Sequence, residues 1–279
     1  MKFTKMHGIG NDYVYINCFE QSVDMSRIAE LTVRLSDRHF GVGSDGVILI
    51  CPSDKADFRM RMFNGSDGSE AEMCGNGIRC VGKYVYYKHL TDKTTVTVET
   101  LGGIKVLHLN IDGGAVSSVR VDMGEPVFNC TDIPVDTDKP VFVNQGVDTP
   151  FGEYRLTCVS MGNPHAVTFV DSVDDVQIDK IGPALENHPL FPKRANIEFV
   201  QRVSPGILKM RVWERGTGET LACGTGACAS LVAAVLGGVS GRKVKMLLLG
   251  GELELEWNED DNHIYMTGPA QFVFDGELL

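Results

Sequence analysis

An internal repeat of about half the chain length limits the possible folds more than any other feature of this 279-residue sequence. Three separate motifs recur at offsets of 148, 149 and 152 positions. The matching positions are Leu101-Gly102-Gly103 with Leu249-Gly250-Gly251, then Glu70, Cys74, Gly75 and Gly77 with Glu219, Cys223, Gly224 and Gly226, and Gly10-Asn11 with Gly162-Asn163. Because three matches at nearly one offset indicate a duplication, we expect two homologous halves with the same order of elements. We predict a first half over 1–124, to which the tail 269–279 returns, and a second half over 125–268, related by a pseudo-twofold axis.

Each half is predicted to be rich in strands, with one or two helices. The alternating or β-branched runs, which are typical of strands, are 13–16, 94–100 and 251–257. The segment 26–36 has apolar residues at helical spacing and Asp24 as a candidate cap, which predicts an amphipathic helix. A weaker helical pattern covers 173–186, where Gly182-Pro183 interrupts it.

Two further helices are predicted to begin directly after cysteines. Gly75–Tyr87 carries apolar residues at helical spacing, whereas Gly224–Leu236 is apolar on nearly every face. A helix that is apolar all round must be enclosed on all sides. We therefore predict an α/β (α+β) fold in which each half is a curled, mostly antiparallel sheet or barrel around one central helix. The longest apolar stretch, 227–239, is too short to span a bilayer and is predicted to be a buried helix.

Charge and cysteine content exclude several classes of partner. With 26 Lys and Arg against 37 Asp and Glu, the formal net charge is −11, which disfavours nucleic acid and anionic membranes as partners. The chain opens without a basic and apolar leader, so we expect a cytoplasmic protein with reduced thiols. Eight cysteines are too sparse for a disulfide scaffold, and six of them are predicted to be small buried apolar residues.

Cys74 and Cys223 are the exceptions, since each precedes a predicted helix and a Gly-x-Gly sequence. A helix N-terminus carries unsatisfied N–H groups and a partial positive charge, which favour a thiolate and can lower its pKa below about 8.5. The glycines let a ligand approach the backbone, where the N–H groups suit a carboxylate. If the pseudo-twofold axis brings both helix ends together, the two thiols face one pocket. One thiolate and one thiol can then invert a stereocentre beside a carboxylate, by removing a proton from one face and delivering one to the other.

Specific motifs occur along the whole chain in a fixed order. They are Lys5-Met6-His7-Gly8-Ile9-Gly10-Asn11-Asp12, Met73-Cys74-Gly75-Asn76-Gly77-Ile78-Arg79-Cys80, Met161-Gly162-Asn163-Pro164-His165, Asn196-Ile197-Glu198-Phe199-Val200, Trp213-Glu214-Arg215-Gly216 and Ala222-Cys223-Gly224-Thr225-Gly226-Ala227. In order and spacing, these motifs closely resemble those of the diaminopimelate epimerase family. The resemblance implies two similar α/β domains with the active site in the cleft between them, and a homodimer. It also implies a cofactor-independent, two-base epimerase that converts LL- to meso-diaminopimelate for lysine and peptidoglycan precursor synthesis.

The resemblance also implies roles for individual residues. Cys74 and Cys223 match the catalytic pair, and Gly75-Asn76 and Gly224-Thr225 match the positions that hold the α-carboxylate. The matching substrate-binding positions are Asn11, Asn64, Asn163, Asn196 and Arg215, and the residues that support catalysis are Glu214 and His165. Amides with one arginine fork suit the distal carboxylate and ammonium, and Glu214 can hold the ammonium at the reacting centre. One departure is Gly46, which follows Gly41-Val42-Gly43-Ser44-Asp45 where some relatives have a glutamine.

Other interpretations remain open on the sequence. Proline and hydroxyproline racemases share the fold, but their first motif typically has histidine where this chain has Asn76, and their substrate needs no distal reader such as Arg215. Isomerases of the phenazine-biosynthesis type lack one or both cysteines. A thiol redox sensor could form a Cys74–Cys223 disulfide, but it would leave the asparagines unexplained. Cys74 to Cys80 and Cys223 to Cys228 are not C-x-x-C pairs, so we expect no zinc or thioredoxin-like site.

Overall fold

The computed structural model describes residues 1–278, and the chain divides into two compact units. The first unit comprises residues 1–121 together with the segment that starts at 267. The second unit comprises residues 122–266. The C-terminal segment therefore returns to the first unit, where its strand pairs with the strand at the N-terminus.

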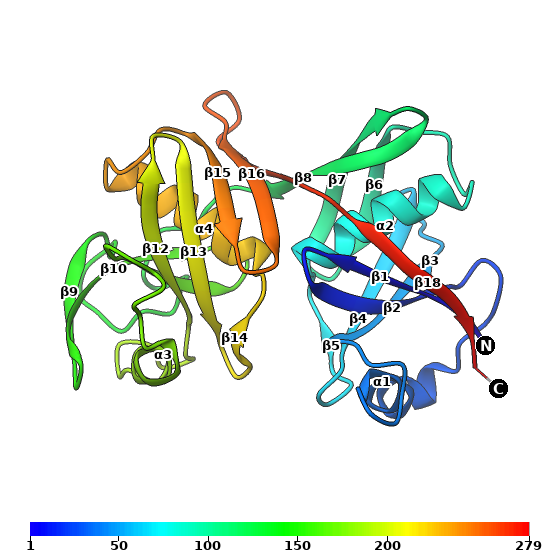
Figure 1. Ribbon diagram of the computed structural model, residues 1–279, viewed down its shortest axis with the longest axis horizontal. Coiled ribbons are helices and arrows are strands. Elements are labelled where there is room, and N and C mark those ends of the chain that lie inside the picture. The colour runs from blue at the N-terminus through cyan, green and yellow to red at the C-terminus, as the bar shows by residue number, and fades with distance from the viewer. Residues whose placement is uncertain (279) are drawn as a thin grey trace. The chain divides into compact units, whose positions relative to one another are not determined.

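The first unit contains most of the N-terminal elements and the last strand (Figure 1). Its elements are β1 (Lys2–Gly8), β2 (Asn11–Asn17), η1 (Met25–Arg27), α1 (Ile28–Ser36), β3 (Gly46–Cys51), β4 (Phe58–Asn64), β5 (Glu70–Ala71), α2 (Gly75–Tyr87), β6 (Thr95–Thr100), β7 (Gly103–Asp112), β8 (Ala115–Gly124) and β18 (Gln271–Glu277). Asp24 caps the short 3-10 turn η1, because its side chain accepts a hydrogen bond from the Ser26 backbone N–H. The predicted helix over 26–36 is confirmed, with its first turn wound as this tighter helix.

The second unit contains the remaining elements. These are β9 (Gln145–Thr149), β10 (Gly152–Ser160), β11 (Pro164–Phe169), α3 (Ile178–Glu186), β12 (Asn196–Ser204), β13 (Ile207–Glu214), β14 (Gly218–Thr220), α4 (Gly224–Leu236), β15 (Lys243–Leu248), β16 (Gly251–Trp257) and β17 (Ile264–Gly268). The predicted helix over 173–186 is wrong in its first five residues, since α3 begins at Ile178. Arg211 Nη1 donates to the carbonyl oxygens of Val173 and Val176, which holds this stretch in an extended turn beside β13.

Both units repeat one scheme of strand pairing. In the first unit β1 pairs with β2, β3 with β4, β4 with β5, and β6 with β7, all antiparallel, whereas β2 with β3 and β4 with β6 are parallel pairs. In the second unit β10 to β16 take these places in the same order and with the same directions. Each parallel pair is joined through a helix, as a parallel connection requires. The predicted fold class, mixed and mostly antiparallel sheet with a repeated order of elements, is confirmed.

Helices α2 and α4 are the central helix of each unit, and their predicted bounds are confirmed. α4 contacts β10, β11, β12, β15 and β16, so strands pack against its apolar side chains on several sides. The apolar stretch 227–239 is not helical to its end, because the helix stops at Leu236 and Gly238 takes a positive φ of 67°. Among the described residues, no helix is both long and apolar enough to cross a membrane.

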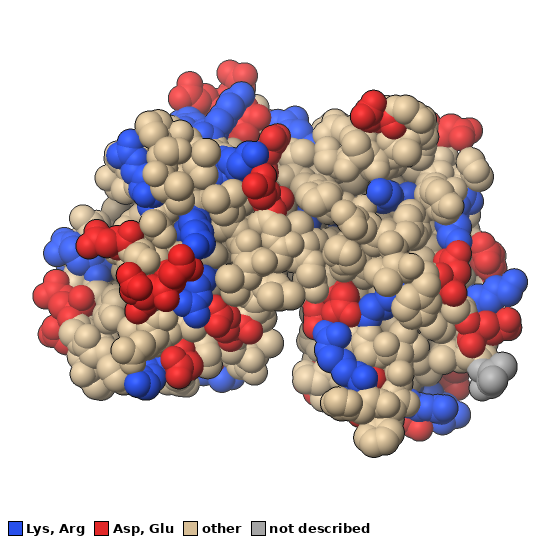
Figure 2. Space-filling model, in the orientation of Figure 1, with Lys and Arg blue, Asp and Glu red and all other residues tan. Residues whose placement is uncertain are grey.

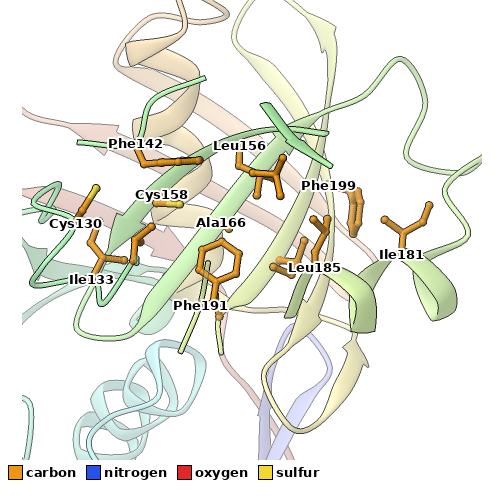
Figure 3. Close-up of a cluster of buried hydrophobic side chains, with 14 of the residues drawn as sticks. Cys130, Ile133, Phe142, Leu156, Cys158, Ala166, Ile181, Leu185, Phe191 and Phe199 are labelled. Carbon is orange, nitrogen blue, oxygen red and sulfur yellow. The ribbon is translucent and has the colours of Figure 1, made fainter. Parts of the chain in front are cut away.

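An apolar cluster fills the space between α3 and the sheet of the second unit (Figure 3). Leu185 and Ile181 of α3 pack towards Phe199 of β12, and the cluster extends to Cys158 of β10. Gly182 lies against the indole of Trp213, where a Cβ would be 2.5 Å from the ring carbon Cγ. α3 can therefore approach the sheet this closely only with glycine at position 182.

Replacing Gly182 by alanine is expected to destabilise the protein, although alanine normally favours a helix over glycine by about 1 kcal/mol. The added methyl group would overlap the Trp213 ring, which its Nε1 hydrogen bond to Glu186 (2.8 Å) holds in place. Overpacking of this kind costs about 1–3 kcal/mol, measurable by denaturant unfolding. Gly241→Ala is the matched control, because no atom lies within 4 Å of its added Cβ. Equal unfolding free energies for the two variants would contradict the packing argument.

Candidate active site

Cys74 forms the N-cap of α2 and is the centre of the polar cluster in the first unit. Its Sγ accepts a hydrogen bond from the Gly77 backbone N–H (3.3 Å) and donates one to Asn11 Oδ1 (3.1 Å). Tyr13 lies beside this thiol, and burial, followed by the negative charge of a Cys74 thiolate, raises the pKa of the Tyr13 phenol well above its usual value. A neutral phenol and an amide therefore surround the sulfur at neutral pH.

A carboxylate network fixes the side chain of Asn11. Asn11 Nδ2 donates to Asp45 Oδ2 (2.7 Å), and Arg38 bridges Asp45 and Asp12 at 2.8 Å each. Burial, together with the charge of Asp12, raises the pKa of Asp45. Burial also acts to raise the pKa of Asp12, but hydrogen bonds from Arg38 and the buried Lys5 outweigh it, and this pKa lies below its usual value. Asn11 thus presents its amide oxygen to Cys74 in a fixed orientation.

Gly46 and Asn64 lie opposite each other where β3 and β4 meet this cluster. A Cβ on Gly46 would be 2.1 Å from the Phe63 carbonyl oxygen, so this backbone leaves no room for a side chain there. Asn64 Nδ2 donates to Ser69 Oγ (3.0 Å), which ties Asn64 to the end of the turn between β4 and β5.

Cys223 repeats the arrangement of Cys74 at the N-cap of α4. Its Sγ accepts from the Gly226 backbone N–H (3.4 Å) and lies 3.5 Å from Thr225 Oγ1. Burial, and then the negative charges of Glu214 and Glu198, raise the pKa of this thiol well above its ordinary value. The expectation that the helix N-terminus leaves this sulfur with a lowered pKa is therefore wrong for Cys223, because these two effects outweigh the helix. Cys223 rests as a protonated thiol.

His165 and Glu198 form a fully buried pair behind Cys223, with neither side chain exposed. His165 Nδ1 lies 2.7 Å from Glu198 Oε1, and its Nε2 lies 3.0 Å from Asn163 Oδ1. A Cβ on Gly226 would be 2.6 Å from Glu198 Oε1, so the first turn of α4 rests on this carboxylate. The role of Glu198 was missed from the sequence. Its signal is a single charged residue within the otherwise apolar stretch that follows Asn196.

Arg215 and Asn196 lie at the ends of neighbouring strands in the second unit. The Arg215 backbone N–H donates to Asn196 Oδ1 (2.9 Å), and Arg215 Nη1 donates to the Lys193 carbonyl oxygen (3.1 Å). Glu186 of α3 accepts from the Gly216 backbone N–H (2.9 Å) and so anchors the same turn. Glu186 is a second residue that the sequence did not single out.

The candidate residues therefore form two sets, one in each unit. The first set is Asn11, Asn64, Cys74, Gly75 and Asn76, and the second is Asn163, His165, Asn196, Glu214, Arg215, Cys223, Gly224 and Thr225. Each set supplies a sulfur that can exchange a proton and a helix N-terminus that can bind an anion. Within residues 1–278, no group of three or more His, Cys, Asp or Glu side chains could hold a metal ion.

The repeated fold, with a cysteine at the start of each central helix, defines an isomerase of the racemase and epimerase class. The family model described as diaminopimelate epimerase matches residues 3–129 and 157–273. A diaminopimelate epimerase of Acetivibrio thermocellus is 61% identical over 278 residues, covering 100% of this chain and 98% of the relative. One from Methanococcus maripaludis is 58% identical, covering 100% and 99%. This chain belongs to the diaminopimelate epimerase family.

Solved structures with low sequence identity share the fold. A hydroxyproline epimerase from Agrobacterium vitis superposes with a TM-score of 0.69 at 13% identity, covering 100% of this chain and 90% of the other. A PhzF-family phenazine biosynthesis protein from Bacillus anthracis gives 0.70 at 17%, covering 100% and 99%. These likenesses support the fold, whereas the family assignment rests on the closer relatives and does not favour the racemase or redox-sensor interpretations.

The raised pKa of Cys223 has a measurable consequence. Thiolate absorbance assigned to Cys223, taken as wild type minus Cys223→Ser, is expected to appear only above the pH at which a free thiol ionises, about 8.5. Glu214→Gln removes one of the opposing charges and should move this step to lower pH. The Cys223 thiol ionises at a lower pH in the unfolded chain than in the folded protein. The free energy of unfolding should therefore fall as the pH rises past the ordinary thiol pKa. A Cys223 step below pH 8.5 would show that the helix N-terminus dominates.

Loss of the buried carboxylate at position 198 is expected to destabilise the second unit. Glu198→Ala removes the partner of His165 Nδ1, and breaking a buried pair by deleting one member typically costs about 3–5 kcal/mol. Glu198→Gln keeps an acceptor of nearly the same shape and should cost less. Denaturant unfolding measures both. An alanine variant as stable as the glutamine variant would contradict this role of the pair.

Proposed function

We propose that this chain converts LL-2,6-diaminopimelate to meso-diaminopimelate by a cofactor-independent mechanism in which Cys74 and Cys223 exchange the α-proton. The observation that carries the proposal is the duplicated N-cap, in which each sulfur accepts the N–H of the third helical residue of its own central helix. Relatives more than half identical over the full chain are named for this reaction. The product serves lysine and peptidoglycan precursor synthesis.

The proposed chemistry needs one base, one acid and a place for negative charge. A Cys74 thiolate removes the α-proton, the electron pair of the broken C–H bond delocalises into the α-carboxylate, and the Cys223 thiol delivers its proton to the opposite face. The reverse direction exchanges these roles. The N-termini of α2 and α4 carry the partial positive charge of a helix start, so they suit the carboxylate as its negative charge increases. The mechanism requires both sulfurs to reach one α-carbon.

The protonated state of Cys223 suits the acid in this scheme. Burial, followed by the charges of Glu214 and Glu198, raises the pKa of Cys223 and so favours the proton on its sulfur. An α-ammonium bound at Glu214 would neutralise one of these two charges and make the Cys223 thiolate less costly. Substrate binding would therefore prepare the same sulfur to act as the base in the return direction.

The remaining polar residues are proposed to read the distal end of the substrate. Asn11, Asn64, Asn163, Asn196 and Arg215 supply amides and one guanidinium for a carboxylate and an ammonium. Asn196 Oδ1 accepts a hydrogen bond from the Arg215 backbone N–H, which fixes the backbone from which the guanidinium extends. Gly46 has no side chain, and we propose that the distal end of the substrate is bound without a side-chain contact at this position.

The unit-level organisation is also part of the proposal. We propose that the halves 1–124 and 125–268 are duplicated domains, each supplying one sulfur, and that the tail 269–279 completes the first. We also propose that the protein is a homodimer and lies in the cytoplasm with reduced thiols.

Cys74→Ala and Cys223→Ala are each expected to lower the epimerisation rate by at least about 10²–10⁴-fold, because each removes one proton-transfer group. The assay uses LL-diaminopimelate in deuterated buffer with a reductant and without added cofactor, following inversion and deuterium uptake at the α-carbon. Cys80→Ala and Cys228→Ala are matched controls, since both cysteines are buried in the same two helices away from the caps.

Turnover near the wild-type rate in either cap variant would refute the two-base assignment. Absence of both inversion and deuterium uptake in the folded wild-type protein would refute the proposed activity itself.

A further inference from the structure

Cys18 and Cys51 lie side by side at the end of two parallel strands. The register of β2 and β3 pairs Ile16 with Leu49 and Asn17 with Ile50, so Cys18 is the next residue and Cys51 its counterpart. The Cys18 backbone N–H donates to the Ile50 carbonyl oxygen (2.9 Å), which continues the ladder to this point. Because alternate residues share a face, both sulfurs lie on the face that carries Ile16 and Leu49.

Two arginines follow on the next strand of the same face. Antiparallel pairing of β3 with β4 places Arg59 opposite Cys51 and Arg61 opposite Leu49. The residues Cys18, Cys51 and Arg59 therefore form one row across three adjacent strands. This row lies at the edge of the apolar cluster of the first unit, and beside it Arg61 forms an ion pair with Glu70 (2.7 Å).

The exposure of this pair distinguishes it from the other cysteines outside the caps. Cys18 and Cys51 are half-buried, which corrects the expectation that six cysteines are buried apolar residues. They remain accessible because they lie where their strands end. The fully buried ones are Cys80, Cys130, Cys158 and Cys228. Reactive thiols are partly exposed, as these two are.

We propose that Cys18 and Cys51 form a dithiol site that reduces an anionic low-molecular-weight disulfide and is itself oxidised to a Cys18–Cys51 disulfide. Opposite residues on neighbouring strands have Cα atoms about 4.8 Å apart, within the range of about 4.4–6.8 Å that a disulfide spans. Arg59, opposite Cys51, places a positive charge beside the thiols for the carboxylates of such a reagent. The site is independent of the proposed epimerase chemistry.

The exchange is balanced in two steps. The Cys18 thiolate attacks one sulfur of the reagent RSSR, forms Cys18–S–SR and expels RS⁻. The Cys51 thiol gives its proton to RS⁻, and its sulfur then attacks Cys18 Sγ and expels the second RS⁻, which takes up the proton that Cys18 released. Two protein thiols are oxidised and RSSR is reduced to two RSH.

Cys18 is the attacking sulfur. A hydrogen bond from the Cys51 thiol and the charge of Arg61 lower the pKa of Cys18 despite its partial burial. Cys51 donates this hydrogen bond and is partly buried, and both effects raise its pKa. Cys51 therefore waits as a thiol until the mixed disulfide forms.

The site is remote from the residues proposed for epimerisation. Asn11 and Cys18 lie at opposite ends of β2, about 23 Å apart at roughly 3.3 Å per residue. Cys18→Ser and Cys51→Ser are therefore expected to keep the wild-type epimerisation rate, and the two proposals can fail separately.

The test exposes the reduced full-length protein to oxidised glutathione, quenches with an alkylating agent under denaturing conditions and maps peptides without reduction. Wild type should yield a peptide linked through Cys18 and Cys51, with Cys130 and Cys158 alkylated as internal controls. Cys51→Ser should accumulate a glutathione mixed disulfide at Cys18.

Uncharged hydroxyethyl disulfide tests the arginines. Arg59→Gln should slow the reaction with oxidised glutathione more than the reaction with this neutral reagent. A wild-type digest without the Cys18–Cys51 peptide, a Cys51→Ser protein unmodified at Cys18, or equal slowing by Arg59→Gln with both reagents would overturn the proposal.

Discussion

The first turn of a buried helix, closed by a cysteine sulfur, is the constraint on which the rest of each unit depends. A helix end buried without partners is costly, and the Gly77 and Gly226 N–H groups find theirs in Cys74 and Cys223. The cap fixes each sulfur relative to the remaining N–H groups of its helix. Strands on several sides of α4 then hold that end in place. Proton exchange and anion binding therefore arise from one local structure, repeated once.

Periodicity was sufficient to predict the parts of the fold that depend on apolar burial. Gly224–Leu236 is apolar on nearly every face, and a helix of this kind is stable only when other elements enclose it. In the structure it is the central helix of the second unit. The runs predicted as strands at 13–16, 94–100 and 251–257 correspond to β2, β6 and β16, although β6 begins one residue later, at Thr95. The helix predicted over 173–186 was wrong in its first residues, because Arg211 of a strand distant in sequence binds their carbonyl oxygens. Local pattern cannot register such a contact.

The polar support of the site could not be predicted for a similar reason. Cys74 and Cys223 were identified through the repeat, but the carboxylates behind them, Asp45, Glu186 and Glu198, act through side chains brought from other elements. Asp45 orients Asn11 and Glu198 orients His165, whereas Glu186 anchors the turn after Arg215 through the Gly216 backbone N–H. A sequence shows that these residues are charged, but only the strand register shows which partner each one meets.

Two opposing influences meet at Cys223, and their balance decides which protonation state of its sulfur is favoured. The helix N-terminus and Thr225 favour the thiolate, whereas burial and the charges of Glu214 and Glu198 favour the thiol and prevail. Cys74 has the same cap, but the neighbours of its sulfur are an amide and a neutral phenol. An inversion by two bases needs one group of each kind at any moment. Duplication of the helix supplied two similar sulfurs, and the side chains around them differ between the two units.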